Sequence, residues 1–217
     1  MYPSDFLHLA EETGLVVPIG RRVLGEACRQ IRQWQTAMPL PEDFAITVNL
    51  SARELQDPRL VKETALMLGD NALNARNLIF EITESSAMSD PETILATMHE
   101  LRRLGVRLAL DDFGTGYSSL SHLCDFPIDL IKIGKPFVDR LGREGTNGPF
   151  TNAIFRFADS LSLDVVAEGI EQAAQVGSLR DLNCGLGQGF HFSRPMPPTE
   201  AEHFLRQAFC SHPRKAA

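Results

Sequence analysis

Short apolar, β-branched runs alternate along the chain with longer stretches that have helical spacing. The short runs predict strands at 45–50, 78–82, 107–112, 130–133, 164–168 and 189–192. The longer stretches predict amphipathic helices at 21–34, around 61–68, at 91–104, near 152–161 and near 172–182. Because strands and helices alternate, the pattern predicts a parallel sheet whose strands are joined by crossover helices.

The predicted strands are apolar along most of their length, which is typical of strands that are covered on both faces. An α/β fold with helices around a parallel sheet is therefore expected. No linker rich in proline, serine and glycine divides the chain, so we expect one domain over residues 1–208. Residues 209–217 are expected to form a disordered tail.

Polar residues interrupt this apolar pattern at or near the carboxyl ends of the predicted strands, except that the polar residue precedes the last strand. Successive members are 20 to 36 residues apart, the size of a βα unit. In a parallel barrel such positions converge on one mouth, although any single Asp or Asn there can simply cap the next helix. The set comprises Asn49, Glu81, Asp111 with Asp112, Lys132, Glu168 and Gln188.

Carboxylates placed in apolar strands are costly unless they are paired or bind a cation. Their oxygen atoms suit Mg²⁺ or Mn²⁺, whereas the six histidines are isolated and do not indicate zinc. The adjacent Asp111 and Asp112 could contact two cations about 4 Å apart, as in the hydrolysis of phosphodiesters. Lys132 would then orient a water or offset phosphate charge; alternatively, it merely neutralises the nearby acids.

The segment from Asp112 to Leu120 is the most specific local string, and it contains Gly114 and Gly116. These glycines permit unusual backbone angles or close backbone approach, but they could equally shape only a tight turn between strand and helix. Asp-Phe-Gly also occurs in protein kinases. The other kinase strings are absent, so a kinase is excluded.

Composition narrows the class of protein further. Lys and Arg total 21 against 28 Asp and Glu, so the net charge is -7, and DNA or RNA polymers are not expected partners. The chain shows neither an apolar run of about 20 residues nor a signal peptide, and we expect no membrane insertion. The cysteines are scattered, which indicates reduced thiols in a cytoplasmic protein. They are Cys28, Cys124, Cys184 and Cys210. Whether a longer protein that contains this chain is tethered to a membrane stays open.

These residues together resemble the EAL domain, the bacterial cyclic di-GMP phosphodiesterase module. The matching strings appear in family order across roughly residues 3 to 205. They are Phe6 with Ala10-Glu11, Asn49-Leu50-Ser51, Glu81 to Glu84, Asp111 to Leu120, Lys132-Ile133, Ala167 to Gly169 with Glu171, and Gln188 to Pro195.

The resemblance implies a (β/α)8 TIM-like barrel that converts cyclic di-GMP to linear pGpG with two Mg²⁺ or Mn²⁺ ions. It implies metal ligation by Asn49, Glu81, Asp111 and Asp112, and catalytic roles for Lys132, Glu168 and Gln188 around the attacking water. Glu84 would anchor the loop after Asp112, Glu171 would support the site, and Pro195 would lie near a guanine. A homodimer is implied through the 113–120 region or the open barrel edges.

Two departures from the family pattern matter. The Glu-Ala-Leu string is absent, so the resemblance implies that two strands, a metal-binding Glu and a phosphate-binding Arg would lie before Met1. About six strands of an incomplete barrel are then expected here, with open edges. Gly134 stands where the family usually has Asp, which would further weaken the ion site.

Three origins stay open: a piece of a longer protein, a start assigned too late, or a degenerate member. Retention of the other site residues favours a missing piece, and little hydrolysis is expected of this chain alone. The alternatives to an enzyme are a non-catalytic receptor for the dinucleotide and a protein-interaction domain that uses the open edges.

Overall fold

The computed structural model of the chain describes residues 5–114, 125–141 and 149–210. Its strands form one parallel sheet in the order β1-β2-β3-β4-β5-β6. The strands are β1 (Ile46–Leu50), β2 (Leu78–Thr83), β3 (Arg107–Phe113), β4 (Leu130–Ile133), β5 (Asp164–Ala167) and β6 (Leu186–Gly187).

Helices follow or precede each strand, as expected for crossover connections. The longer helices are α1 (Leu7–Thr13), α2 (Val16–Ala37), α4 (Leu60–Asp70), α6 (Pro91–Arg103), α9 (Pro149–Ser160), α10 (Ala173–Asp181) and α11 (Pro198–Cys210). Short ones are α3 (Ala52–Leu55), α5 (Glu84–Ala87), α8 (Lys135–Val138) and the 3-10 turn η2 (Ala75–Asn77).

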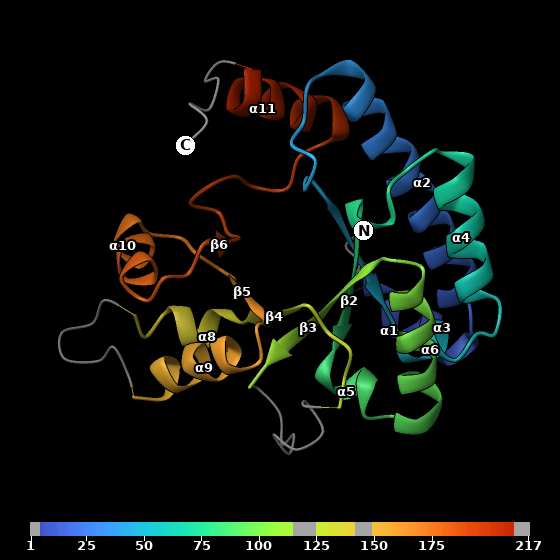
Figure 1. Cartoon of the computed structure of the whole chain (residues 1–217), viewed down its shortest axis with the longest axis horizontal. Helices are drawn as coiled ribbons and strands as arrows, with labels where there is room; N and C mark the ends of the chain where they lie inside the picture. The colour runs from blue at the N-terminus through green and yellow to red at the C-terminus, as the bar shows by residue number, and fades with distance from the viewer. Residues whose placement is uncertain (1–4, 115–124, 142–148, 211–217) are drawn as a thin grey trace.

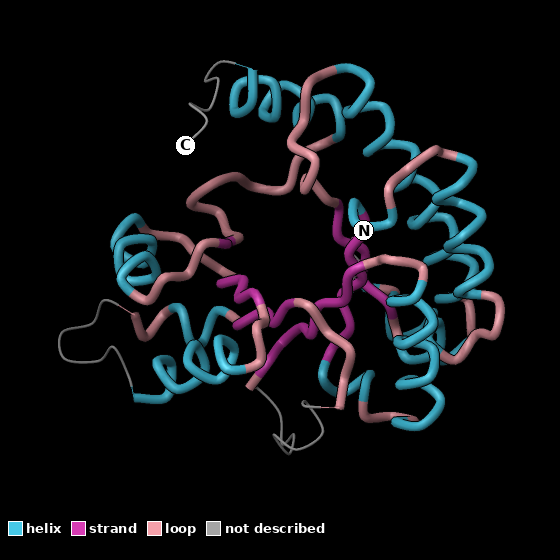
Figure 2. The backbone as a smooth tube through the Cα atoms, viewed as in Figure 1, coloured by secondary structure: helices cyan, strands magenta, loops and turns pink. Residues whose placement is uncertain are grey.

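The sheet curves into an arc with helices on its outer side, and it does not close into a ring (Figures 1 and 2). Within the described residues, β1 pairs only with β2, and β6 pairs only with β5. The prediction of an incomplete α/β barrel with about six parallel strands is confirmed.

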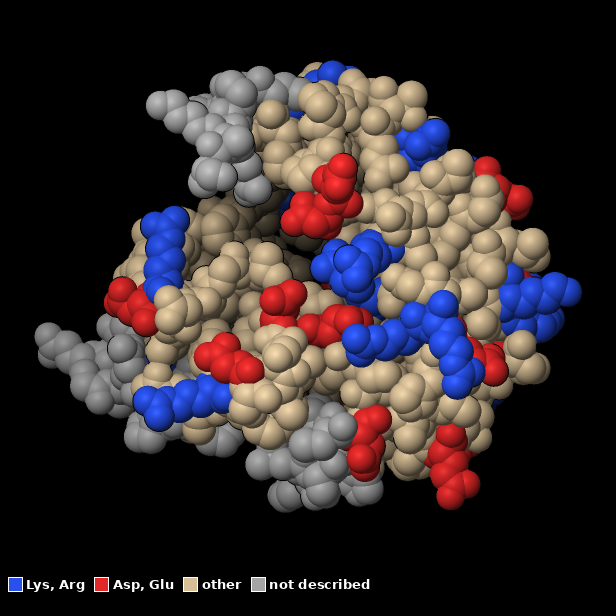
Figure 3. Space-filling model, in the orientation of Figure 1, with Lys and Arg blue, Asp and Glu red and all other residues tan. Residues whose placement is uncertain are grey.

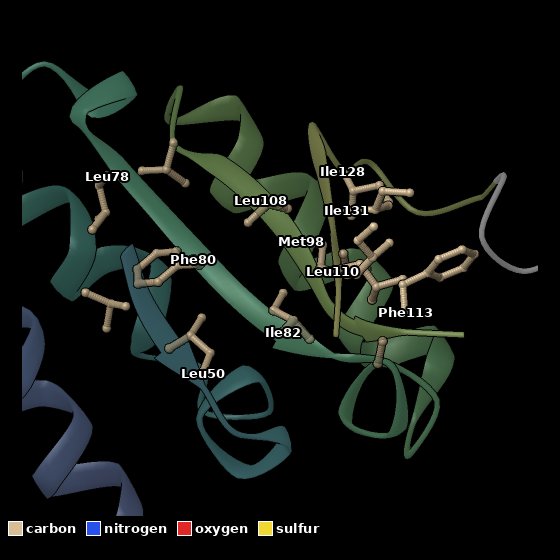
Figure 4. Close-up of a cluster of buried hydrophobic side chains, with 14 of the residues drawn as sticks. Leu50, Leu78, Phe80, Ile82, Met98, Leu108, Leu110, Phe113, Ile128 and Ile131 are labelled. Atoms are coloured by element: carbon tan, nitrogen blue, oxygen red, sulfur yellow. The ribbon is translucent and has the colours of Figure 1, made fainter. Parts of the chain in front are cut away.

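The main core lies between the sheet and the helices, because alternate residues of each strand face outward. Phe80 and Ile82 of β2, Leu108 of β3 and Met98 of α6 are completely buried there (Figure 4). A second, smaller apolar layer lies on the other face of the sheet, where Ile79, Ala109 and Leu130 pack together. The side chains two positions further along these strands share that inner face.

Five predicted strands agree with the structure to within a few residues, but the last prediction was wrong. Residues 189–192 form a turn, in which the N–H of Phe192 donates to the carbonyl of Gly189 at 3.0 Å, and the strand is Leu186–Gly187 instead. The aromatic run is not a strand because Gly189 turns the chain against Ile170, which leaves Phe190 and Phe192 about half exposed. Gln188 therefore follows β6 directly, as Glu168 follows β5, whereas the other polar residues lie within the last residues of their strands.

The predicted helices correspond to α2, α4, α6, α9 and α10, whereas α1 and α11 were not predicted. Phe209 and Cys210, placed in the expected tail, belong to α11, and residues 211–217 lie outside the described part of the chain.

Charges of both signs are interspersed on the face shown in Figure 3, around a hollow at its middle. No continuous basic surface covers this face. Among the described helices, none is both long enough and apolar enough to cross a bilayer.

Candidate active site

Lys132 lies at the centre of a group of acidic side chains. Its Nζ atom is 2.8 Å from Glu81 Oε2, 3.5 Å from Asp111 Oδ1 and 2.7 Å from Glu168 Oε1. Lys132 and Glu81 are buried, with 4% and 6% of their surfaces exposed. Strand alternation explains this convergence: Glu81, Asp111 and Lys132 each lie two positions after a residue of the inner apolar layer. The structure thus brings together residues predicted from four different segments.

The electrostatics of this group favour a permanently charged lysine. Burial by itself lowers the pKa of Lys132, but hydrogen bonds to Glu168 and Glu81 and the nearby negative charges raise it to about 12. Burial raises the pKa of Glu168, and the contact with Lys132 only partly opposes that effect. Lys132 therefore acts as a hydrogen-bond donor near neutral pH, while Glu168 accepts a proton more readily than an ordinary glutamate.

Asn49 lies beside this group on the neighbouring strand. It is paired in register with Glu81 across β1 and β2, so the two side chains lie side by side on the inner face. Asn49 is exposed, whereas Val48 and Leu50 on either side of it are buried in the outer core. Its amide is consequently available to a ligand at the rim.

Asp111 and Asp112 occupy an irregular end of β3. The register with β4 shifts between Leu110 and Phe113, and Asp112 has a positive φ of 56°. Asp111 contacts Lys132, and a Cβ atom built on Gly134 would lie 3.6 Å from Asp112 Oδ1. The irregular end of β3 thus brings two consecutive carboxylates close to the end of β4, Asp111 beside Lys132 and Asp112 beside Gly134.

Glu84 holds the start of the segment that follows Asp112. Its Oε2 atom accepts a hydrogen bond from the N–H of Gly114 at 3.3 Å, and its side chain is buried. Gly114 has a φ of 81°, and a Cβ atom built on it would lie 3.1 Å from the ring of Phe137. The anchoring contact expected of Glu84 is thus present at Gly114, while residues 115–120 of the proposed dimer loop lie outside the described residues.

The three remaining predicted residues, Glu171, Gln188 and Pro195, lie after β5 and β6 in the chain. Gln188 follows β6; its backbone is fixed, since its N–H donates to the carbonyl of Ala167 at 2.8 Å, while its side chain is exposed. Glu171 binds Lys135 at 2.8 Å rather than Lys132. Pro195 is exposed beyond the turn at 189–192. These residues are not joined to Lys132 by a direct contact in the described structure.

Asn49, Glu81, Asp111 and Asp112 offer amide and carboxylate oxygens from adjacent strands, which are the ligands that a hard divalent cation prefers. Lys132 itself lies among three carboxylates. Within the described ranges, no group of three or more His, Cys, Asp or Glu side chains is already arranged to hold a metal ion. A cation bound there would compete with Lys132 for Glu81 and Asp111.

Two buried polar residues, in helices that follow β1 and β5, were not predicted. Glu54 accepts hydrogen bonds from the N–H and hydroxyl of Ser51, directly after β1. Gln175 accepts from the N–H groups of Glu171 and Gln172. Each belongs to a capping box, and the spacing of Ser51-x-x-Glu54 is a recognisable signal for one.

Comparison with known proteins decides the family, because the model of the EAL domain matches residues 1–195. The chain belongs to the EAL domain family. MucR of Pseudomonas aeruginosa, a bifunctional diguanylate cyclase and cyclic di-GMP phosphodiesterase, is 42% identical over 195 residues, which are 90% of this chain and 28% of MucR. The chain spans about a quarter to a third of the length of such curated relatives.

Solved EAL domains share the fold described above. A structure of the PaMucR phosphodiesterase in complex with c-di-GMP is 41% identical, has a TM-score of 0.85, and is matched over 93% of this chain and 81% of that chain. Klebsiella pneumoniae BlrP1, in a complex with manganese and cyclic di-GMP, is 28% identical with a TM-score of 0.74, over 82% of this chain and 45% of that chain. Among these homologues, MucR is a cyclic di-GMP phosphodiesterase.

Proposed function

We propose that residues 1–208 form an EAL unit whose polar rim binds cyclic di-GMP and hydrolyses it to pGpG when the barrel is complete. The observation that carries the proposal is the position of Lys132, within 3.5 Å of Glu81, Asp111 and Glu168 at the carboxyl ends of the strands. In a parallel barrel that end is where catalytic residues gather. The cytoplasm supplies the dinucleotide and keeps the thiols reduced.

Mg²⁺ or Mn²⁺ would be held by Asn49, Glu81, Asp111 and Asp112. When bound, two such ions activate a water and neutralise charge on the phosphate. Lys132 remains protonated and donates hydrogen bonds, so its role is to orient the water and stabilise negative charge rather than to remove a proton. Glu168, with its raised pKa, is suited to accept a proton from that water on a carboxylate oxygen. Gln188 would orient the same water from the end of β6.

Two features of this chain argue for weak hydrolysis by the chain alone. Gly134 supplies no carboxylate next to Asp112, and β1 has a free edge among the described residues. The same features favour a second candidate, a receptor that binds the dinucleotide without cleaving it. A homodimer through the 113–120 region or through the open edges is compatible with either role.

The test is an assay of the purified chain with cyclic di-GMP and Mn²⁺, in which pGpG is followed by chromatography, beside calorimetry of the dinucleotide in EDTA. Slow formation of pGpG that Lys132→Met abolishes supports the enzyme. Binding without product supports the receptor. If neither binding nor turnover occurs, both roles are wrong for this chain.

A further inference from the structure

Gln175 of α10 is a buried amide whose hydrogen-bonding atoms both have partners. Its Oε1 atom accepts from the N–H groups of Glu171 at 2.8 Å and Gln172 at 2.9 Å, and its Nε2 atom donates to Asp139 Oδ1 at 3.2 Å. Only 6% of its surface is exposed. A buried amide with this set of partners fixes the groups that it joins, because leaving any of them unpaired is costly.

The segment that Gln175 fixes begins at Glu168. Gly169 has a φ of 68°, and a Cβ atom there would lie 2.6 Å from Cβ of Lys135, so the chain turns tightly against α8 at this point. The N–H of Ile170 donates to the carbonyl of Gln188 at 3.1 Å, and the carbonyl of Ile170 accepts from the N–H of His191 at 2.9 Å. One segment, 168–172, therefore contacts the turn that carries Gln188.

Gln188 follows a much shorter strand than those that carry Asn49, Glu81, Asp111 and Lys132. The strand that precedes it, β6, has two residues, and among the described residues it pairs only with β5. Gly189 packs directly on the segment, since a Cβ atom on it would lie 2.1 Å from the carbonyl oxygen of Ile170. Gln188 is thus held from two sides: its N–H donates to the carbonyl of Ala167 in β5, and its carbonyl accepts from the N–H of Ile170 in the segment 168–172.

We propose that Gln175 is a positioning residue that holds Glu168 and Gln188 in one arrangement through the segment 168–172. The inference rests on the proposed function for the roles of those two residues. Glutamine is suited to this place because one atom must accept from two N–H groups while the other donates to a carboxylate. Glutamate has the same shape, but it would put a second acceptor and a second negative charge against Asp139.

This difference gives a matched set of variants: Gln175→Glu, Asp139→Asn, and the two combined. Gln175→Glu keeps the acceptor for Glu171 and Gln172 but loses the donor toward Asp139. In the combined variant the amide of residue 139 donates to the carboxylate of residue 175, so the hydrogen bond is restored in reverse. Should Gln175→Glu not fold, Gln175→Ala replaces it.

Two measurements decide the role. In steady-state hydrolysis with Mn²⁺, Gln175→Glu is expected to lower kcat by about 10- to 100-fold with little change in KM, and the combined variant to recover most of the loss. In hydrogen exchange followed by mass spectrometry, Gln175→Glu is expected to speed exchange in peptides covering 168–172 and 186–192 together, with recovery in the combined variant.

Faster exchange confined to α10, with peptides 186–192 unchanged, would overturn the inference, as would a kcat equal to that of the parent protein. If the unsubstituted chain shows no turnover, hydrolysis by this chain is ruled out. The joint response of the two peptides then still decides whether Gln175 couples them.

Discussion

Lys132 Nζ lies 2.7 Å from Glu168 Oε1, which joins the middle of β4 to the residue that follows β5. Replacement by methionine keeps the length of the side chain but leaves three clustered carboxylates without their cation. We expect Lys132→Met to lower the rate of hydrolysis by about 100- to 1000-fold. We also expect it to lower the free energy of unfolding in urea by about 3 kcal/mol.

The stability that Lys132 contributes should fall at high pH, because its pKa in the folded protein, about 12, lies above the ordinary value of 10.5. The stabilisation by Lys132 is fully present below pH 10.5 and is lost as the pH rises through 12.

The control for Lys132→Met is Lys62→Met, at an exposed position on α4, which should change the free energy of unfolding by less than about 0.5 kcal/mol. Equal stability of the two variants at pH 7 would contradict the central role of Lys132.

Gly134 leaves room for a side chain beside Asp112. Its φ of −70° and ψ of 165° suit any residue, and an added Cβ atom would be 3.6 Å from Asp112 Oδ1, an ordinary contact. We expect Gly134→Asp to strengthen Mn²⁺ binding by about 10-fold in calorimetry, because it adds a carboxylate next to a proposed ligand. Gly134→Ala is the matched control and should bind Mn²⁺ as the parent does. The prediction is wrong if the two variants bind equally.

Gly20 of α2 is required by the carboxyl group of Glu54. A Cβ atom on Gly20 would lie 1.6 Å from Glu54 Oε1, and that carboxyl group is buried with Ser51 as its donor. Gly20→Ala is therefore expected to lower the free energy of unfolding by about 1–3 kcal/mol. Gly25→Ala, on the same helix with its nearest neighbour at 3.9 Å, should instead raise it by about 0.5–1 kcal/mol.

The Glu54→Ala variant tests whether Glu54 causes the loss of stability in Gly20→Ala. In Glu54→Ala the space opposite Gly20 is empty, so adding Gly20→Ala should no longer be destabilising. A cost of Gly20→Ala that persists there would show that something other than Glu54 is displaced.

Cys28 is buried in the outer core on α2, with 1% of its surface exposed. Burial raises the pKa of its thiol from 9.0 to about 11. Iodoacetamide at pH 8.5 should therefore alkylate Cys28 only after unfolding, as read from the mass of its peptide. Because the thiol ionises more easily in the unfolded chain, stability should fall between pH 9 and 11, and this slope should be shallower in Cys28→Ala. Rapid alkylation in the folded protein would contradict the burial.

The sequence was sufficient for the parallel α/β arrangement and for the centre of the site. Apolar strands that are buried on both faces have a clear pattern, and a residue such as Glu81 or Lys132 stands out in it. The convergence of those two residues followed from one rule, that parallel strands bring their carboxyl ends to the same edge.

The remaining features depend on contacts between distant segments. The aromatic run at Phe190 and Phe192 has strand composition, yet β6 precedes it, because Gly189 turns the chain against Ile170. Likewise, Gln175 is an ordinary helical residue by pattern, and its importance depends on Asp139, which is 36 positions away. Local periodicity contains no information about such a pair.

The left-handed backbone at Asp112 determines whether the pair Asp111-Asp112 could be built into another protein. Copying the letters Asp-Asp onto another barrel strand of regular pleat would send one carboxylate to the interior and the other to the helical layer. A protein engineered to hold the same pair of carboxylates would therefore need the distortion at the end of β3 as well as the two aspartates.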